Sequence, residues 1–516
     1  MSPSISITRR SSLYSLPLVV ALSLVGSVPA LAQNAAWFGL NVPSGLGDPH
    51  QPVVDVSAVN PAPASVPAGE EGYADLRGAA ILPMVQSIVD FSIQSRVAGE
   101  KSWGRVTGFP AAKATLEWTA QQFRDAGLTE VAVQEYDGTG AMWWPQNWEA
   151  KVLGNAAFGA GSMDVVLGSA LPNGGSEIPG GTLTAPLAFA GHVDDPLPTT
   201  DLTGKVAVQL LTPAGGAYSE RGATRDRSQQ LMAKGAVAVL NVVRQTGNMH
   251  VRDFANCNGP CFNLGTDDGE FLMQAIEKAA QSGVVEQLQI QLSLQASALT
   301  GLKGHNAMGI VRGRSTENII VNAHADGWFD AAGDNADGLA VLIAMARHFA
   351  RPENMPERTL VFVASGGHHS SGLNGPANFV SMNPALTASS VLALNLEHIA
   401  QFRVVPGDWN VESTEQPMGF GISNASPFLT DLTRRGVERY GFRLNPDIGT
   451  DTPGDLGGYR PLNIPMVQAI HSGPLYHTSG DVFGTISVQG LERAARFYVH
   501  FVEGVANATR AEIAPQ

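Results

Sequence analysis

The second half of the chain alternates short, wholly apolar segments with segments of helical spacing. Residues 318–323, 358–364, 390–396 and 465–470 are the apolar segments, and residues 338–350 have the spacing of a helix. Strands that are apolar along their whole length are buried on both faces, as in a largely parallel sheet covered by helices. We therefore predict an α/β fold whose mixed, mostly parallel sheet is sandwiched between helices.

Residues of the kind that bind metals follow the ends of these apolar segments. In an open α/β sheet, ligand sites form beyond the carboxyl ends of the strands. The residues found there are His324, Asp326, Asp334, His368, His369, Glu397 and His477. One His-x-Asp or Gly-Asp-Asn segment is more often a turn than a ligand set, but several segments converge here. Imidazole and carboxylate groups are zinc ligands, so we predict a metal site in which Asp334 can bridge two ions and Asp326 can orient His324.

The chain carries an excess of acidic residues. It has 46 Asp and Glu residues against 32 Lys and Arg residues, which gives a net charge of −14. This charge argues against nucleic acid or an anionic membrane surface as a partner, because both repel a negatively charged protein. The oligomeric state has no signature in the sequence.

Residues 1–32 have the features of a signal peptide. Arg9 and Arg10 precede an apolar stretch at 13–28, and residues 30–32 form an Ala-Leu-Ala cleavage pattern. The alternative is a membrane anchor, but serine, glycine and proline residues make this stretch short and broken for a span. We expect cleavage near Ala32 and a periplasmic or secreted protein that has no membrane association afterwards. The twin-arginine pattern lacks its usual aromatic residue, so the export route stays open.

The rest of the chain is expected to form an arm, a larger domain and an inserted module. Residues 33–75 are rich in Pro, Ala, Gly and Val, which is typical of a linker or a loosely attached arm. The larger domain has two parts, 76–150 and 301–516. Between them, residues 151–300 consist of short β-rich runs separated by glycine-rich turns, which predicts a separate, strand-rich module.

The two cysteines of the chain, Cys257 and Cys261, lie within this module. In an oxidising compartment a turn of this kind can close a small disulfide loop. A zinc site would need two further ligands nearby, and none is obvious in the sequence. The disulfide is therefore the favoured interpretation.

Several segments together resemble a known enzyme family. They are Asn-Ile-Ile-Val-Asn-Ala-His-Ala-Asp at 318–326, Gly-Asp-Asn-Ala-Asp-Gly at 333–338, the segment 358–367, Asn-Leu-Glu at 395–397, Tyr-His-Thr at 476–478 and Gly-Arg-Val-Thr-Gly at 104–108. In order and spacing they resemble the co-catalytic zinc aminopeptidases and glutamate carboxypeptidases of metallopeptidase family 28. The module at 151–300 resembles a protease-associated domain, notably at 202–208 and 234–240. The resemblance implies a zinc exopeptidase-like fold.

The resemblance also implies a role for each matched residue. His324, Asp334 and Glu397 match the ligands of one zinc ion, and Asp334 bridges to the second ion. His369 and His477 match the other ligands of that second ion, which is the less certain of the two. His368 stands in the position of the general base. The implied substrate is a peptide or a small molecule with a related amide or ester bond.

The chain departs from the family at the pair His368-His369, where the family has Glu-Glu. At position 369 a neutral imidazole keeps a donor that zinc accepts but removes one negative charge. The second ion should then bind less tightly, or a metal that prefers nitrogen is selected. At position 368 an imidazole near metal cations is a weak proton acceptor. General-base help is worth roughly 10² to 10⁴ in rate, so slow hydrolysis can survive; alternatively His368 is itself a ligand.

Three interpretations follow from this departure. The first is a metal-dependent hydrolase with His368 as base, and the second is a catalytically degenerate metallopeptidase-like binding protein. The third is altered metal chemistry. The retained ligand types at 324, 334, 397 and 477 favour the first. A serine hydrolase finds little support, because the chain has no Gly-x-Ser-x-Gly elbow on a strand-to-helix turn.

Residues beside the matched positions have weaker signals. Four aromatic residues could line a substrate pocket, although aromatic residues beside a sheet more often belong to the core: Trp328, Phe329, Trp409 and Tyr459. Asp455 matches a loop aspartate of the family, and a role in a turn is equally consistent with its neighbours. His398 and His471 adjoin matched positions, and we expect them to hydrogen-bond ligands at most.

Overall fold

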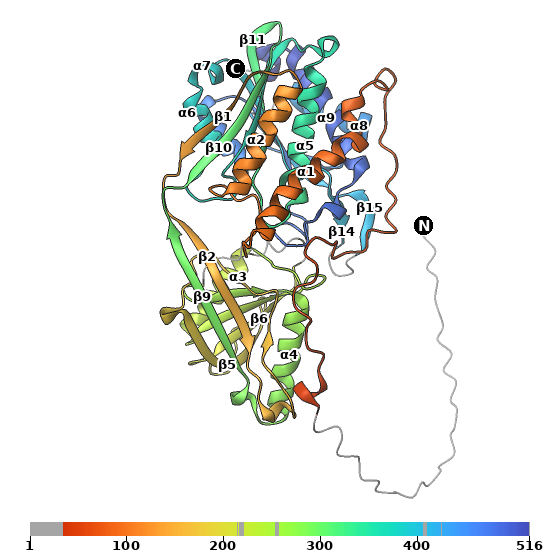
Figure 1. Cartoon of the computed structure of the whole chain (residues 1–516). Coiled ribbons are helices and arrows are strands. Elements are labelled where there is room, and N and C mark those ends of the chain that lie inside the picture. The colour runs from red at the N-terminus through yellow and green to blue at the C-terminus, as the bar shows by residue number, and fades with distance from the viewer. Residues whose placement is uncertain are drawn as a thin grey trace, which may run out of the picture.

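The computed structural model describes residues 35–213, 215, 221–252, 257–405, 410–424 and 426–514. The expected signal peptide at 1–32 and Trp409 lie outside the described residues. Two eight-stranded sheets form two bodies, one above the other in Figure 1. Among the described residues, no helix combines the length and the apolar character needed to cross a bilayer.

The first sheet contains the apolar segments of the second half of the chain. Its strands, in spatial order, are β1 (Thr129–Asp137), β10 (Lys303–Val311), β12 (Arg358–Ser365), β11 (Ser315–His324), β13 (Ser390–Leu396), β18 (Met466–Ile470), β16 (Met418–Ser423) and β17 (Leu444–Gly449). The four central strands β12, β11, β13 and β18 are parallel. Antiparallel pairings of β1 with β10, β10 with β12, and β16 with β18 make the sheet mixed. The predicted mixed, mostly parallel sheet is confirmed.

Helices cover both faces of this sheet. Successive side chains of a strand point to opposite faces, so one strand can contribute to the core on each side. Ile319 and Val321 of β11 pack in the core on one face, and Ile320 packs in the core on the other. The first core also contains α1 (Gly78–Val97), α2 (Pro110–Asp125), α5 (Asp337–Phe349), α8 (Pro427–Tyr440) and α9 (Val488–Asn507). The second core contains residues of α6 (Gly375–Met382), α7 (Pro384–Thr387) and the 3₁₀ helix η9 (Gly454–Leu462). The sheet is therefore sandwiched, as predicted.

The second sheet is curled and belongs to the inserted stretch. Its strands are β3 (Val165–Val166), β2 (Met142–Val152), β9 (Gln289–Leu299), β5 (Thr182–His192), β6 (Val206–Leu211), β7 (Ala238–Val243), β8 (Cys261–Leu264) and β4 (Leu171–Pro172), with helices α3 (Arg221–Ala233) and α4 (Thr266–Gln281). Strand β2 begins before residue 150, so the sheet reaches into the stretch 76–150. Cys257 and Cys261 form the predicted disulfide at the start of β8. Nothing in this geometry identifies the module as a protease-associated domain, which stays a prediction.

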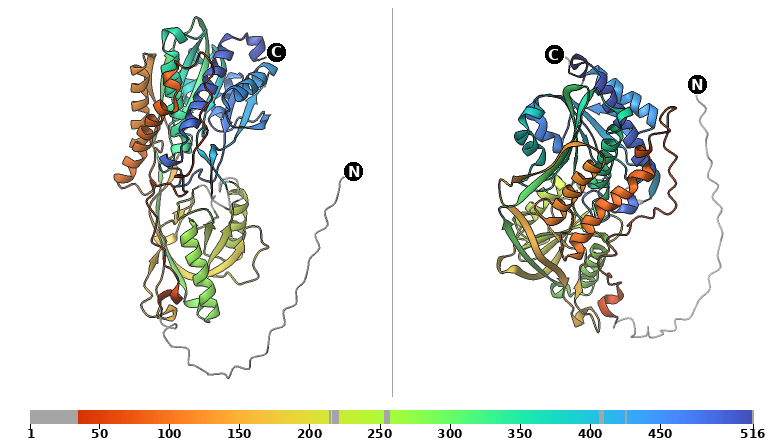
Figure 2. Two further views of the ribbon diagram at one scale, coloured as in Figure 1. Left: turned by 90° about the vertical axis from the view of Figure 1, so that its right-hand side faces the viewer. Right: turned by 45° about the horizontal axis from the view of Figure 1, so that its top comes forward.

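The two sheets are joined by a pair of antiparallel ribbons. Asp137 of β1 pairs with Lys303 of β10, and a few residues further on Met142 of β2 pairs with Leu299 of β9. The chain therefore leaves the first sheet and returns to it at neighbouring positions, as the long strands β2 and β9 show in Figures 1 and 2.

The segment 35–75 follows both bodies as an extended arm. Trp37 of the 3₁₀ helix η1 (Ala36–Gly39) is 2% exposed and packs in the core of the second body. Further along, Val54 packs with Met249 and Leu475, which come from the two bodies. The arm ends at η2 (Ala74–Leu76), directly before α1.

Candidate metal centre

His324 ends strand β11 and is completely buried. Its Nδ1 atom lies 3.0 Å from the backbone carbonyl oxygen of Asp326. Its Nε2 atom points the other way, 3.3 Å from Oδ1 of Asp334 and 3.7 Å from Oε1 of Glu397. The strand thus delivers one imidazole nitrogen to two carboxylates.

Asp334 lies between β11 and α5 and presents its two carboxylate oxygens to different histidines. Oδ1 lies 3.3 Å from His324 Nε2, whereas Oδ2 lies 3.0 Å from His477 Nε2. His369 Nε2 lies near both oxygens, 3.2 Å from Oδ2 and 3.3 Å from Oδ1. Asp481 fixes this loop by accepting hydrogen bonds from the backbone N–H groups of Gly333 and Asp334, at 2.7 and 3.0 Å. This is the arrangement expected of a carboxylate that bridges two ions.

Glu397 follows strand β13 and is held by one of its two oxygens. Oε2 accepts hydrogen bonds from Asn395 and Gln468, at 2.7 and 2.8 Å. Among the described residues, Oε1 has no hydrogen-bond donor although it is buried. Burial opposes ionisation, but the neighbouring imidazoles of His368 and His324 hold the pKa of Glu397 at about 2. The group is therefore an ionised carboxylate with one oxygen aimed at histidine nitrogens.

The pair His368-His369 follows β12, and Asp326 holds its backbone. The two carboxylate oxygens of Asp326 accept the N–H groups of His368 and His369, at 3.2 and 3.0 Å. The same carboxylate lies 3.7 Å from Nδ1 of His324, further away than the carbonyl of Asp326 itself. Asp326 therefore orients His324 chiefly through its backbone, and its side chain shapes the histidine loop.

His368 is oriented by Asp455, whose role the sequence left open. Nδ1 of His368 lies 2.9 Å from Oδ1 of Asp455, and its ring stacks on that of His324 with centroids 4.1 Å apart. Asp455 Oδ2 in turn accepts hydrogen bonds from Ser365 and Asn322, at 2.8 and 2.9 Å. The Nε2 atom of His368 faces Oε1 of Glu397 at 3.5 Å.

His477 completes the group and is tied to the second body. Its backbone carbonyl accepts the N–H of Arg252 at 3.0 Å, and Val251 forms a β-bridge with Thr478. Burial and the charges of Arg252 and Arg221 hold the pKa of His477 well below its ordinary value. The ring is consequently neutral, which is the form that binds a metal.

The predicted aromatic residues belong to the core more than to a pocket. Tyr459 is fully buried against Phe379 and donates a hydrogen bond to Asn322 at 2.9 Å. Trp328 and Phe329 are 5% and 1% exposed, and the guanidinium of Arg252 lies 3.3 Å above the ring of Trp328.

His398 approaches the centre more closely than the sequence indicated. Its Nε2 atom lies 2.9 Å from Oδ1 of Asp334, and its Nδ1 atom lies 2.6 Å from the carbonyl oxygen of His471. The predicted hydrogen bond to a ligand residue is thus present. The ring of His471 makes a local contact, in which Nδ1 accepts the N–H of Gly473. The position of His398 directly after Glu397 was the one signal available in the sequence.

These residues fit a metal centre by the chemistry of their donor atoms. Three sets have their donor atoms within 4.8 Å of one another: His324, His368 and His369; His324, Asp334 and His398; and Asp334, His369 and His477. His324 Nε2 and Glu397 Oε1 are buried without hydrogen bonds to the described residues. Imidazole lone pairs and carboxylate oxygens repel at such distances unless protons or cations lie between them.

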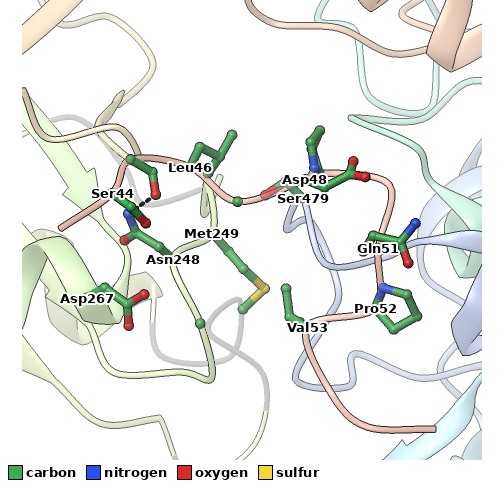
Figure 3. Close-up of a pocket in the computed structure, with 14 residues that line it drawn as sticks. Ser44, Leu46, Asp48, Gln51, Pro52, Val53, Asn248, Met249, Asp267 and Ser479 are labelled. Atoms are coloured by element: carbon green, nitrogen blue, oxygen red, sulfur yellow. Dashed lines mark hydrogen bonds between the residues drawn. The ribbon is translucent and has the colours of Figure 1, made fainter. Parts of the chain in front are cut away.

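A pocket lies where the arm, the module and the loop after His477 meet. It has a volume of about 260 Å³ and is lined by residues 44–49 and 51–53 of the arm, residues 247–249, Asp267 and Ser479 (Figure 3). Ser479 Oγ accepts the N–H of His250 at 3.0 Å, which adds a contact between the module and this loop.

The fold of the chain is similar to that of solved zinc aminopeptidases. The zinc aminopeptidase BSAP from Bacillus subtilis is 19% identical, with a TM-score of 0.57 over 85% of this chain and 98% of its own. A peptidase M28 precursor from Shewanella amazonensis SB2B is 19% identical, with a TM-score of 0.61 over 85% and 97%. The aminopeptidase of Aneurinibacillus sp. strain AM-1 is 17% identical, with a TM-score of 0.50 over 86% and 96%.

Residues 306–502 match the family model described as peptidase family M28. A comparison of the sequence with curated proteins gives no match. The resemblance inferred from the motifs at 318–326 and 333–338 is confirmed by the family match.

Proposed function

We propose that this chain is an exported hydrolase with two divalent metal ions, preferably zinc, that cleaves a peptide or a related amide or ester bond. The observation that carries the proposal is the position of Asp334 between two donor sets. His324, beside Glu397, faces Oδ1, and His477 faces Oδ2, while His369 Nε2 lies 3.3 Å from Oδ1 and 3.2 Å from Oδ2. The zinc aminopeptidases that share this fold support the choice of reaction.

In this proposal, separate residues of the chain transfer the proton and position the groups that react. When bound, such ions act as Lewis acids that polarise a carbonyl group and lower the pKa of water. As water attacks the substrate carbonyl, His368 takes up the proton of that water at Nε2, because Asp455 holds the N–H at Nδ1 and thereby fixes the tautomer. Asp326 keeps the backbone of His368 and His369 in place through its two hydrogen bonds. After bond cleavage, His368 returns the proton to the leaving group.

Metal content and two variants of His368 test this proposal. We expect the purified mature protein to contain stoichiometric metal and to hydrolyse aminoacyl or acyl-amino-acid substrates, with loss of activity on chelation and recovery on adding zinc. His368→Glu should raise the peptidase rate, since a carboxylate is the stronger proton acceptor beside cations. His368→Gln, which cannot accept a proton in this way, serves as the control and should lower kcat. A protein without stoichiometric metal would sink the hydrolase proposal.

The second candidate is a catalytically degenerate binding protein on the same scaffold. The observation in its favour is the imidazole at position 368, because it is a weaker proton acceptor near cations than the carboxylate of the family pattern. In that case the protein binds metal but shows no turnover, and His368→Glu creates activity that the natural chain lacks. The two candidates are thus separated by the activity of the natural chain.

Export is also part of the proposal. It is supported by the signal-peptide features of residues 1–32 and by the Cys257–Cys261 disulfide, since disulfides persist in oxidising compartments.

A further inference from the structure

His398 is a buried histidine that the family pattern does not account for. It follows Glu397, is 1% exposed and has a φ of 54°, a left-handed conformation that is unfavourable for a residue with a side chain. Unfavourable backbone conformations persist where the surrounding structure fixes them, and they cluster at functional sites. The two nitrogens of the His398 ring lie in different surroundings.

The outer nitrogen of His398 is held by the backbone. Nδ1 donates to the carbonyl oxygen of His471 at 2.6 Å, which leaves the lone pair of the neutral ring on Nε2. His324 has the same arrangement, with Nδ1 against the carbonyl of Asp326 and Nε2 facing inward. Histidines that ligate a metal usually donate their other N–H to a carbonyl or carboxylate in this way.

The inner nitrogen of His398 faces the same two carboxylates as His324. Nε2 of His398 lies 2.9 Å from Asp334 Oδ1 and 3.6 Å from Glu397 Oε1. For Nε2 of His324 the corresponding distances are 3.3 and 3.7 Å. Ligand atoms bound at about 2.0–2.1 Å to a tetrahedral zinc ion lie roughly 3.3–3.4 Å apart, so the four contacts match the edges of one coordination tetrahedron.

From this geometry we infer that His398 is a fourth protein ligand, which joins His324, Asp334 and Glu397 around one metal ion. The inference rests on the metal-binding part of the proposed function. His368 differs, since it lies beside Glu397 and Asp455, whereas His398 lies beside both Asp334 and Glu397.

A fourth ligand gives the two ions different tasks. Sites with four protein ligands are closed and structural, whereas catalytic sites keep a position for water or substrate. The set Asp334, His369 and His477 supplies three ligands and leaves such a position. An ion held by His398 would therefore keep the side chains of Asp334 and Glu397 in place. The ion on the side of His369 would then be the one that activates the substrate for hydrolysis.

Variants at 398 and a matched histidine at 471 test the inference by counting ligands. X-ray absorption at the zinc edge should show two imidazoles for each ion in the natural protein, and competition with a chelator gives the affinities. His398→Leu should lose one imidazole ligand and lower the affinity for one of the two ions by more than about 100-fold. This is the upper end of the loss in metal affinity when a residue that only hydrogen-bonds a ligand is replaced. His471→Asn should leave both quantities unchanged, because His398 bonds the backbone carbonyl of residue 471, which the substitution keeps, and the His471 ring lies edge-on to the His398 ring without a hydrogen bond to it.

His398→Cys covers the case in which His398→Leu does not fold. A thiolate within reach of the ion gives a zinc–sulfur distance of about 2.3 Å, which no other residue of the centre can produce. We expect this signal together with an affinity within tenfold of the natural protein. A bound ion without zinc–sulfur scattering, or His398→Leu with unchanged affinity and imidazole count, would show that His398 only pairs with Asp334.

These outcomes are distinct from a failure of the proposed function. If the natural protein binds no metal, the proposed function and the inference fall together. If it binds two ions and hydrolyses its substrate while His398→Leu binds both ions equally well, only the inference falls. If His398 is a ligand and no substrate is cleaved, the binding-protein candidate gains and the inference stands.

Discussion

At the scale of single residues, Asp455 explains how a histidine can stand where the family has a carboxylate. A glutamate accepts a proton on either oxygen, but an imidazole accepts one only on the nitrogen that lacks hydrogen. Asp455 Oδ1 takes the N–H of Nδ1, so the accepting nitrogen of His368 is Nε2, on the side of Glu397. Ser365 and Asn322 hold the other oxygen of Asp455 and so keep it in place.

Asp455→Asn should lower kcat while leaving metal content and KM nearly unchanged. An amide can donate to Nδ1 as well as accept from it, so part of the protein would carry the wrong tautomer of His368. We expect a loss of about 10- to 100-fold, within the range of general-base catalysis, measured by steady-state kinetics and metal analysis. Ser365→Ala, which removes one neighbour of Asp455, is the control with a smaller effect. Loss of metal in Asp455→Asn would indicate instead that the residue holds the metal centre together.

The sequence predicted the set of site residues better than their individual contacts. His324, Asp334 and Glu397 could be found because each follows an apolar strand or its adjoining loop, and parallel strands end at one edge. The contact of His398 with Asp334 depends on a left-handed backbone, and the contact of Asp455 with His368 joins positions 87 residues apart. Neither spacing nor residue type specifies such contacts.

At the scale of elements, the loop after β11 is fixed by one buried arginine. Arg105 is completely buried, and its guanidinium donates to the carbonyl oxygens of Ala325, Asp330 and Ala331 at 2.9, 2.9 and 3.0 Å. A fourth hydrogen bond reaches Ser92 of α1 at 2.8 Å. The segment before α2 thus ties helix α1 to the loop that carries Asp326.

Arg105→Met should destabilise the protein by about 3 kcal/mol or more. The methionine fills much of the space but leaves the buried carbonyl groups of Ala325 and Asp330 without the donor they have now, and each such group costs roughly 1–3 kcal/mol. The carbonyl of Ala331 keeps the N–H of Ala336. The free energy of unfolding in urea measures the effect. Arg351→Met is the matched control, since Arg351 is exposed and pairs with Asp75, and exposed pairs contribute about 1 kcal/mol or less. Equal effects of the two substitutions would contradict this role of Arg105.

Local sequence patterns predicted individual helices and strands of the first sheet. They did not predict which strands pair with one another. The helix predicted at 338–350 is α5 (Asp337–Phe349), and the strand predicted at 390–396 is β13 (Ser390–Leu396). The order of the strands, with β1 and β10 antiparallel at one edge, depends on contacts between distant residues. Periodicity within a segment carries no information on those contacts.

At the scale of the whole molecule, the module contacts the loop that carries His477 of the proposed metal centre. The backbone of Val251 and Arg252 bonds the loop of His477 and Thr478, and the ring of Trp328 lies beneath Arg252. The centre is therefore built by both bodies, although all its predicted ligands come from the first.

Replacing Arg252 tests this link in the full chain. Arg252→Pro removes the N–H that bonds the carbonyl of His477, while Arg252→Ala keeps the N–H and removes the same side chain. We expect Arg252→Pro to lower the affinity for the ion on the side of His369 and His477 by about 10- to 100-fold relative to Arg252→Ala. This is the range found when a residue that supports a metal ligand is replaced. Chelator competition measures both affinities. If the two variants bind this ion equally, the backbone contact has no part in metal binding.

The ribbon that joins the two bodies has a consequence for the order of folding. Asp137 and Lys303 are partners in the β1–β10 pairing although 166 positions separate them in the chain. Closing a loop costs more entropy the longer it is, and folded residues within the loop shorten it. Pairing of β2 with β9 brings the two ends of the module together, directly beside Asp137 and Lys303. We therefore expect the edge strand β1 to join its sheet only after β2 and β9 have paired.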